Sequence, residues 1–483
     1  MDLFIQLYIA SNYNKKMDYS NVLRDIVPSQ SEIENINVLI NDIIIFIDNL
    51  SSKNGLKAET LLVGSVAKNT WLSGKADIDI FIHFPLETPE DVLKEKGLFL
   101  AYECINHFNG VSEERYASHP YVTGFIGDYE VDFVPCYKIS KSEELKSAVD
   151  RTILHTNYML SHLSSQQTRE VLLLKKFMGG VETYGSEFKT GGFAGYLCEI
   201  FILKYGSFEE TLRATRTWDY GFVIDLEDYG TSSLFDDVMV VIDPTDANRN
   251  VAASLTKEKF LEFKLAAYNF LNNPKEEYFS TYIRPVNGFS VENCNELLES
   301  FNNRESDVLG VVFPVPDLSV DSVYPQLKKT ELSLHDKLDE QGFNVIKSAS
   351  CDVIDGVGLL LFELGVNLLP KYWINYGPSL YYEKACLNFQ KAHDECYIID
   401  DFLVSDVVCE HRTPSEFLNF LFNGNLHLFS VGKNLAKGIS EDYKLYNINE
   451  LLENSKFLGL IENNDAFIQF LYDFLHPQKY LQR

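Results

Sequence analysis

Two aspartates, at positions 77 and 79 of the stretch DIDIFIHF, are separated by a single isoleucine. Apolar residues occupy every even position from Ile78 to Phe84, and this alternation predicts a β-strand with one buried face. Side chains two residues apart in a strand share a face, so Asp77 and Asp79 are expected to point to the same side. Two neighbouring carboxylates repel each other unless a cation lies between them. The pair therefore predicts a divalent metal site.

A third carboxylate, Asp132, lies in a second alternating stretch, EVDFVPCYK, with Glu130 expected on the same face. Three carboxylates on adjacent strands suit two Mg²⁺ ions, because hard cations prefer oxygen ligands. Two such ions ~3.5–4 Å apart can activate an attacking hydroxyl and stabilise a leaving pyrophosphate. The alternative is that Asp132 only caps a surface hairpin.

A small-residue turn precedes the aspartates. Gly64 and Ser65 follow the apolar residues 60–63, and a Gly-Ser turn can cradle a phosphate because the small residue lets the backbone approach closely. Most such pairs are plain turns. The pattern becomes specific because Asp77 and Asp79 follow about a dozen residues later. The combination predicts a site that handles a nucleoside triphosphate with metal ions.

Length, composition and cysteine pattern limit the class of protein to which this site can belong. The 483 residues predict two to four domains, and the 46% hydrophobic content is enough for true cores. No apolar run reaches the ~18 residues of a membrane-spanning helix. An acidic residue at position 2 argues against a signal peptide. The eight cysteines form no CxxC pair, so we expect neither a disulfide framework nor a zinc site, and a cytoplasmic location fits.

The net charge of −28 is the opposite of what a nucleic-acid-binding protein usually carries. The charge is uneven, however. Residues 133–220 contain eleven basic and ten acidic residues, a balance of 11 − 10 = +1. A neutral-to-basic lane on an acidic protein can still bind a polyanion, so the total charge does not exclude an RNA substrate.

The residue pattern also predicts how the chain is organised. A hairpin is expected over residues 121–134 with its turn at Gly127-Asp128, and mainly helices over 150–220. The stretch DPTDANRN, residues 243–250, is expected to be a polar loop. From Asp307 a strand, a helix and two strands follow, an order consistent with an RRM-like or ferredoxin-like unit. The aromatic and basic stretch LPKYWINYGPSLYYEKACLNFQKAH interrupts that unit before its last strands and helices.

The motifs GSVAKNTWLSGKADIDIF and VDFVPCYK together resemble the nucleotidyltransferase superfamily. The resemblance extends to archaeal-type (class I) CCA-adding tRNA nucleotidyltransferases. It continues through SAVDRTILHTNYM, YGSEFKTGGFAGYLCE, DPTDANRNVAASL and FPVPDLSVDSVYPQL, and more thinly through YGPSLYYEK and VGKN. It covers most of the chain from about residue 30.

The resemblance implies roles for individual residues. Asp77, Asp79 and Asp132 match the family's metal-binding carboxylates, and Gly64 and Ser65 match the turn at the incoming triphosphate. Lys68 stands where the family commonly has arginine, which keeps the charge but loses bidentate contact. The positions that match contacts to the nucleotide are His155, Lys175, Tyr184 and Arg249. Of these, Arg249 is implied near the base, and Lys175 is preferred to Lys176 for its nine-residue step to Tyr184. His119 also fits the pattern without an assigned role.

Each of these residues has a plainer interpretation. His155 could be a histidine on a helix surface, Lys175 a solvated lysine and Tyr184 a half-buried aromatic. Arg249 and Asp246 could simply tie a loop together. The aromatic stretch around Tyr372, Trp373 and Tyr376 is expected to be partly core. The family resemblance favours the nucleotide-binding interpretation for the first group, and it places Gly377-Pro378 in a tail that docks the tRNA elbow.

The architecture that follows is α/β and α+β in several domains. We expect a nucleotidyltransferase (polymerase β-like) head over 1–150, a helical neck over 151–275, and an RRM-like body over 276–483 with a helical tail inserted at about 365–395. The implied activity is CCA addition and repair at the 3′ end of tRNA from CTP and ATP, with two Mg²⁺ ions and no nucleic-acid template. A homodimer is one open arrangement, because the sequence does not fix the oligomeric state.

Two other functions remain open on the sequence alone. A poly(A) polymerase or oligoadenylate synthase of the same superfamily would share the three carboxylates, and the C-terminal half and the product length distinguish it. A catalytically silent RNA-binding or nucleotide-sensing protein is the second. The complete carboxylate set argues against the second, because a silent protein has no need of all three.

Overall fold

The computed structural model describes residues 17–116, 120–142, 145–147, 149–285, 291–351, 353–354, 356–453 and 465–483. The chain forms two compact units. Unit 1 runs to Tyr282 and takes the chain up again from Tyr480 to Arg483, while unit 2 comprises Ile283–Lys479. All eight cysteines lie in the described ranges and are free. No helix within these ranges combines the length and apolar character needed to cross a bilayer.

Unit 1 begins with helices that precede a five-stranded sheet. Its helices and strands, in chain order, are α2 (Ser20–Ile26), α3 (Gln30–Lys53), β1 (Glu59–Val63), α4 (Gly64–Ala67), β2 (Asp77–Phe84), α5 (Glu90–His107), β3 (Val111–Tyr116), β4 (Pro120–Ile126), β5 (Tyr129–Tyr137), α6 (Arg151–His162), α7 (Ser165–Gly180), α8 (Gly195–Tyr205), α9 (Phe208–Ala214), β6 (Phe222–Asp225), β7 (Met239–Asp243), β8 (Asp246–Asn250) and α10 (Lys257–Asn272).

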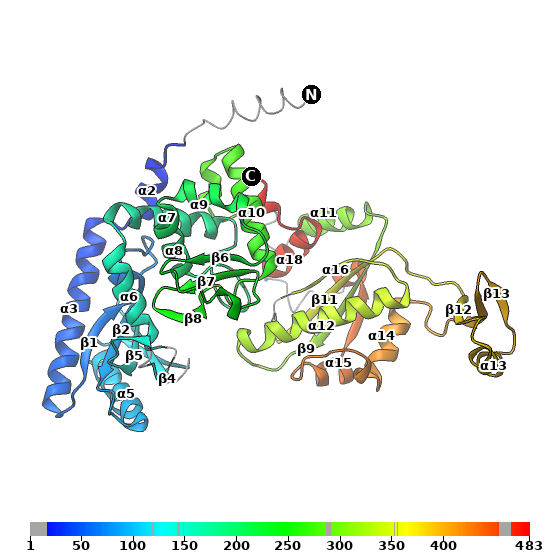
Figure 1. The fold of residues 1–483 in the computed structure, drawn as a ribbon, viewed down its shortest axis with the longest axis horizontal. Coiled ribbons are helices and arrows are strands. Elements are labelled where there is room, and N and C mark those ends of the chain that lie inside the picture. The colour runs from blue at the N-terminus through cyan, green and yellow to red at the C-terminus, as the bar shows by residue number, and fades with distance from the viewer. Residues whose placement is uncertain are drawn as a thin grey trace. The chain divides into compact units, whose positions relative to one another are not determined.

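The five-stranded sheet has the order β1-β2-β5-β4-β3, and only β2 and β5 are parallel. Helix α3 runs alongside β1 (Figure 1) and presents isoleucines at helical spacing to the core. Strand β2 is buried on one face as predicted, but Phe81 and His83 on its other face are buried as well. The second half of β2 is therefore covered on both sides, and only its first residues reach a surface.

The hairpin predicted over residues 121–134 is confirmed, because β4 and β5 pair antiparallel with Ile126 opposite Tyr129. The helices predicted over 150–220 are confirmed as α6 to α9. They pack with α2 and α10 around a second core that includes Phe177, Phe201 and Trp218. The helical half of unit 1 thus has its own apolar centre.

The prediction of a polar loop over residues 243–250 is wrong. Residues Asp246–Asn250 form β8, which pairs with β7 in a small sheet of order β6-β7-β8. Buried Asn250 explains how so polar a sequence forms a strand. Its side-chain oxygen accepts the Val241 amide at 2.8 Å, and its amide group donates to the Met239 carbonyl at 2.9 Å. These bonds take the place of regular ladder bonds.

Unit 2 is built on a four-stranded sheet of order β10-β11-β9-β15. In chain order this is strand 2, 3, 1, 4, the arrangement of a ferredoxin-like βαββαβ unit. The predicted RRM-like body is confirmed. The helices and strands of unit 2 are α11 (Val291–Asn302), β9 (Asp307–Pro314), α12 (Val320–Gln341), β10 (Val345–Ser350), β11 (Val357–Leu364), β12 (Tyr372–Ser379), α13 (Glu383–Ala392), β13 (Tyr397–Ile399), β14 (Phe402–Val408), α14 (Pro414–Phe422), α15 (Ala436–Glu441), β15 (Lys444–Asn447), α16 (Ile448–Glu453) and α18 (Asp465–Leu475).

The inserted tail contains the expected helix, α13, but also a three-stranded sheet of order β12-β14-β13. It extends past the predicted end near residue 395, because β14 pairs with both other strands and ends at Val408. The division of the chain into 1–150, 151–275 and 276–483 remains a prediction, since the first two parts belong to one compact unit.

Candidate active site

Parallel pairing of β2 and β5 brings the acidic residues together. In this register Asp77 lies beside Glu130 and Asp79 beside Asp132. Residues in register on parallel neighbours project to the same face, so the four carboxylates lie on one surface of the sheet. The prediction that Asp77, Asp79 and Asp132 come from adjacent strands is confirmed, while their chemical role stays a prediction.

The surroundings of the site disfavour ionisation of these carboxyl groups and raise their pKa values. Burial, with added repulsion from Asp132 and Asp77, raises the pKa of Asp79 to about 7. Burial and the Glu130 charge raise the pKa of Asp77. Burial also raises the pKa of Asp132, although the Thr123 hydroxyl donates to it at 2.5 Å and opposes that rise. A cation would relieve the repulsion at all three residues.

The donor set fits a hard divalent ion, because Asp77, Asp79 and Asp132 offer only oxygen. Across the described part of the chain, no group of three or more His, Cys, Asp or Glu side chains stands ready to hold a metal ion. Asp132 instead bonds to Thr123. An ion bound at this site would share Asp132 with the Thr123 hydroxyl.

The Gly64–Ser65 turn lies directly against Asp79. Gly64 has a φ of +73°, a region that favours glycine, and a Cβ built there would lie 1.9 Å from Asp79 Oδ2. The Gly64 amide donates to the Thr156 hydroxyl at 3.2 Å, which ties the turn to α6. Only glycine fits this position without displacing the carboxylate.

A buried glutamate among the lining residues of the site lies beside two lysines. Glu199 of α8 accepts Lys68 Nζ at 2.6 Å and the Thr70 hydroxyl at 2.6 Å, and Lys175 Nζ lies 3.9 Å from it. Burial opposes ionisation of Glu199, but the two lysines outweigh it and lower the pKa of this carboxyl. Burial lowers the pKa of Lys175, whose Nζ also donates to the Thr70 carbonyl at 2.7 Å. The two cations are thus fixed in place.

The acidic surface and the lysines face one cavity of about 460 Å³. Seven of the predicted site residues line it, namely Ser65, Lys68, Asp77, Asp79, Asp132, Lys175 and Tyr184. Lys175 lines the cavity and Lys176 does not. Gly64, His155 and Arg249 do not line it either, although Gly64 supports Asp79 from behind.

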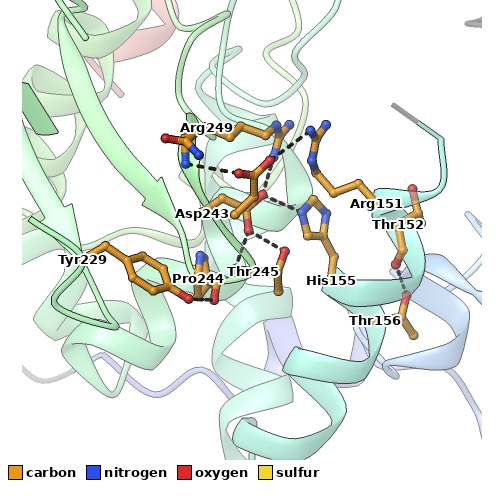
Figure 2. Close-up of polar contacts among 11 residues, drawn as sticks. Arg151, Thr152, His155, Thr156, Tyr229, Asp243, Pro244, Thr245 and Arg249 are labelled. Carbon is orange, nitrogen blue, oxygen red and sulfur yellow. Dashed lines mark hydrogen bonds and ion pairs between the residues drawn. The ribbon is translucent and has the colours of Figure 1, made fainter. Parts of the chain in front are cut away.

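His155 and Arg249 meet at a neighbouring cluster. Figure 2 shows Asp243 between His155 of α6 and Arg249 of β8. His155 Nε2 lies 2.7 Å from Asp243 Oδ2, and Arg249 Nη1 donates to the same oxygen at 2.8 Å. The His155 ring also stacks on Tyr196, which lines the cavity, with centroids 3.9 Å apart. The ring of Tyr196 therefore connects the cluster of His155, Asp243 and Arg249 to the cavity.

Sequence reasoning missed several residues here. Arg115 lines the cavity and donates to Glu130 at 2.6 Å, and Tyr196 and Glu199 line it too. Asp243 lies in the stretch for which the sequence predicts only a polar loop. Glu199 carried a detectable signal, because a lone acid inside the apolar run YLCEIFILKYG must find a partner when buried. His119 lies outside the described residues.

Sequence comparison with known families agrees with this site. The nucleotidyltransferase domain family matches residues 43–155, which contain the three aspartates and the Gly64 turn. The second domain of tRNA nucleotidyltransferase matches residues 169–280, and the C-terminal domain of CCA-adding enzymes matches residues 304–447. The fold and the acidic cavity therefore define a nucleotidyltransferase.

Curated relatives narrow the class further. The chain is 43% identical to the CCA-adding enzyme of Methanothermobacter thermautotrophicus over 96% of its own length and 99% of the relative's. The corresponding enzymes of Methanocaldococcus jannaschii and Thermoplasma acidophilum are 37% and 36% identical, over 85% and 87% of this chain and 92% and 93% of theirs. The chain belongs to the family of archaeal-type CCA-adding enzymes. Among solved structures, a cytoplasmic RNA terminal U-transferase aligns with a TM-score of 0.42 at 13% identity, over 55% of this chain and 98% of that one.

Proposed function

We propose that this enzyme adds and repairs the 3′-terminal CCA of tRNA with CTP and ATP, and that the cavity between β2, β5 and α8 is where it does so. The observation that carries this assignment is the register of β2 against β5. That register sets three aspartates on one face of the sheet, and Lys68 and Lys175 line the same cavity. A cavity that combines metal-binding carboxylates with cations suits a triphosphate whose α-phosphorus must react beside metal ions.

Gly64 and the predicted residues that line the cavity then receive roles. Asp77, Asp79 and Asp132 would hold Mg²⁺, which activates the attacking hydroxyl and stabilises the leaving pyrophosphate when bound. Asp132 belongs to the side of the primer hydroxyl. The 3′ hydroxyl oxygen loses its proton to solvent and bonds to the α-phosphorus, while the bond from that phosphorus to the α–β bridging oxygen breaks and pyrophosphate leaves. The turn at Gly64 and Ser65 receives the phosphates together with Lys68, Lys175 and Tyr184, so catalysis is mostly positioning and charge neutralisation.

The formal charge of the cavity explains why metal and nucleotide should bind together. Its charged lining residues are five carboxylates and three cations, a sum of −5 + 3 = −2. A triphosphate entering such a cavity is repelled by it. We therefore expect nucleotide binding to require a divalent cation, and the affinity for CTP to collapse in its absence.

One cavity has to serve both nucleotides. Across the described residues the set of three aspartates occurs once, and so does the group of His155, Lys175 and Tyr184. The choice between CTP and ATP must then depend on the growing 3′ end, whose added bases change the pocket beside Arg249. Hydrogen-bonding groups in such a pocket reject a mismatched base because they are left unpaired.

The parts of the chain divide the work as the family pattern implies. Residues 1–150 act as the catalytic head, 151–275 as the neck and 276–483 as the body. The lobe of β12, α13, β13 and β14 is assigned to the tRNA elbow. The expectation that Tyr372, Trp373 and Tyr376 are partly core is wrong, because the lobe exposes these side chains as well as Tyr381 and Tyr382. Exposed aromatic rings suit stacking on unpaired bases.

A single incubation tests the proposed function. CCA-less tRNA with CTP, ATP and Mg²⁺ should gain three nucleotides and then stop, with ATP used only after two cytidines. Sequencing gels would show the product directly. A ladder of many adenylates, or equal activity on an unstructured oligonucleotide, would support a poly(A) polymerase instead.

Substitution of Asp79 tests the metal assignment. Asp79→Ala should abolish transfer while tRNA binding changes little, because the RNA is held mainly by other parts of the chain. Asp128→Ala is the matched control, since Asp128 is an exposed carboxylate at the β4–β5 turn. Turnover and filter binding would be measured on both variants. Near-normal incorporation by the Asp79 variant would rule out the carboxylate assignment.

A further inference from the structure

Helix α6 and the hairpin of β7 and β8 are joined by two polar contacts one helical turn apart. Arg151 Nη2 lies 3.1 Å from Asp246 Oδ2, and His155 Nε2 lies 2.7 Å from Asp243 Oδ2. The same helix carries Thr156, which accepts the Gly64 amide at 3.2 Å. Helix α6 thus connects the turn behind Asp79 to the hairpin that carries Arg249.

Asp243 of this hairpin uses both of its carboxylate oxygens in hydrogen bonds. It is fully buried, and its Oδ1 accepts the Thr245 amide at 2.9 Å and the Thr245 hydroxyl at 2.8 Å. Its Oδ2 accepts from Arg249 at 2.8 Å and bonds to His155, as Figure 2 shows. Both oxygens are thus occupied, and the carboxylate is locked between the helix and the hairpin.

An ionised carboxylate can only accept hydrogen bonds, so the proton of the His155–Asp243 bond must sit on Nε2 of His155. Burial opposes the charge on Asp243, but the bonds from His155, Thr245 and Arg249 hold the pKa of Asp243 well below its usual range. The same oxygen holds the Arg249 guanidinium. One atom therefore sets both the tautomer of the histidine and the place of the arginine.

We propose that Asp243 is a positioning residue for nucleotide selection, which fixes His155 as its Nε2–H tautomer and holds Arg249 at a constant distance from it. The proposal rests on the proposed function and on the nucleotide contacts that the family pattern implies for His155 and Arg249. Stacking of His155 on Tyr196 sets the plane of the ring, and Asp243 sets its rotation within that plane. Nδ1 is left as the nitrogen that can meet the substrate.

The chemical state of His155 agrees with this arrangement. Burial lowers its pKa, with contributions from the charges of Arg249 and Lys68, although Asp243 opposes the change. The ring is then neutral near pH 7, and its Nδ1 accepts a hydrogen bond. A neutral acceptor suits a hydroxyl donor of the nucleotide rather than a phosphate oxygen.

Steady-state kinetics with Asp243→Asn test the proposal. The variant keeps the size of the side chain but has one acceptor oxygen where Asp243 has two, so its NH2 group must face the donors of either Thr245 or His155 and Arg249. KM for CTP and for ATP should rise by about ten- to a hundredfold, the loss expected for a charge-assisted hydrogen bond, with a smaller change in kcat. Asp246→Asn is the matched control. It breaks the parallel contact to Arg151 and leaves His155 and Arg249 untouched, so its KM should stay within about twofold of the parent value.

Two more measurements separate positioning from a purely structural role. In a double-mutant cycle, Asp243→Asn and Arg249→Lys should be clearly non-additive in KM, because they disrupt one shared contact. Nitrogen NMR of the full-length enzyme with ¹⁵N-labelled histidine should show His155 as the Nε2–H tautomer, assigned with His155→Gln, and should show that state lost in Asp243→Asn. The NMR result does not depend on CCA addition, so the inference can fail while the proposed function holds. An Nδ1–H tautomer in the parent enzyme, additive KM effects, or equal behaviour of the two Asp variants would overturn it.

Discussion

Asp79 shows at the scale of one residue how catalysis and stability oppose each other in this enzyme. The side chain is kept beside Asp77 and Asp132 in a largely desolvated place, and its pKa is raised to about 7. An unfolded chain would ionise the same residue near its ordinary value of 3.8. Because the native state holds this proton to a higher pH than the unfolded state does, ionisation of Asp79 lowers the stability of the metal-free protein.

The stability of the metal-free enzyme should therefore depend on pH in a defined direction. The stabilising effect of the Asp79 proton is complete below about pH 4 and disappears as the pH rises to about 7. Asp79→Asn cannot ionise, so in EDTA its thermal midpoint should exceed that of the parent at pH 8 and differ less at pH 5. Asp128→Asn on the exposed turn serves as the control. Equal midpoints for parent and Asp79→Asn at both pH values would contradict the strain assigned to this carboxylate.

Gly64 is a second residue that is sensitive to a small change, because one added Cβ atom would collide with Asp79. Gly64→Ala combines a positive φ with a Cβ only 1.9 Å from Asp79 Oδ2, so we expect it to displace the carboxylate and to lower kcat about a hundredfold or more. Gly127→Ala has a similar φ of +59° but nothing within 4 Å of the new atom. It should lose only about 1–2 kcal/mol of stability. The prediction fails if both variants keep parental turnover.

At the scale of elements, local patterns predicted those parts of the fold that depend on neighbours in sequence. The alternation in β2 and β5 was visible because apolar and polar residues follow the pleat of a strand. Strand β8 was not visible, because its polar residues are stabilised by buried Asn250 and Asp243 rather than by an apolar face. The tail sheet was missed in part because β12 pairs with β14, whose sequence lies beyond the aromatic stretch.

The difference between local patterns and distant contacts also explains which residues of the candidate site could be predicted. The aspartates and the Gly-Ser turn occur within short motifs, so their spacing could be read. Glu199 pairs with Lys68 from 131 positions away, and Asp243 meets His155 across 88 positions. Without a map of contacts, no spacing rule brings such residues together. The sequence therefore predicted the acidic wall of the cavity better than the residues that hold its cations.

In the lobe of β12, α13, β13 and β14, helix and sheet pack closely at Gly377. A Cβ on Gly377 of β12 would lie 2.5 Å from the Phe389 ring of α13 and 2.8 Å from the Leu403 carbonyl. Gly377→Ala should separate the helix from its sheet, and overpacking of this kind typically costs about 1–3 kcal/mol. We expect weaker tRNA binding by filter assay with unchanged affinity for CTP. In the control, Gly310→Ala, the nearest atom is at 3.4 Å, an ordinary contact. Equal tRNA affinity in both variants would argue against a role for the lobe in binding.

At the scale of the whole molecule, the chain leaves unit 1 after Tyr282 and returns to it for its last four residues. Tyr480 and Leu481 are buried there, and the Tyr480 hydroxyl donates to Glu262 at 3.1 Å. The Arg483 guanidinium donates to the Ser280 carbonyl at 2.6 Å and lies over the Tyr282 ring. The last residue thus contacts the residue after which the chain leaves, and the C-terminus closes unit 1.

Removal of residues 480–483 should consequently destabilise unit 1 rather than act as a neutral trimming of the terminus. Two buried side chains of this size contribute roughly 3–6 kcal/mol as an upper bound, so the thermal midpoint of unit 1 should fall by several degrees or more in calorimetry of the full chain. The transition of unit 2 should change little, because its four-stranded sheet contains none of these residues. Gln482→Ala, at the exposed position directly after Leu481, is the matched control and should leave both transitions in place. If the truncated and parent enzymes unfolded at the same temperature, the C-terminal residues would contribute nothing to the stability of unit 1.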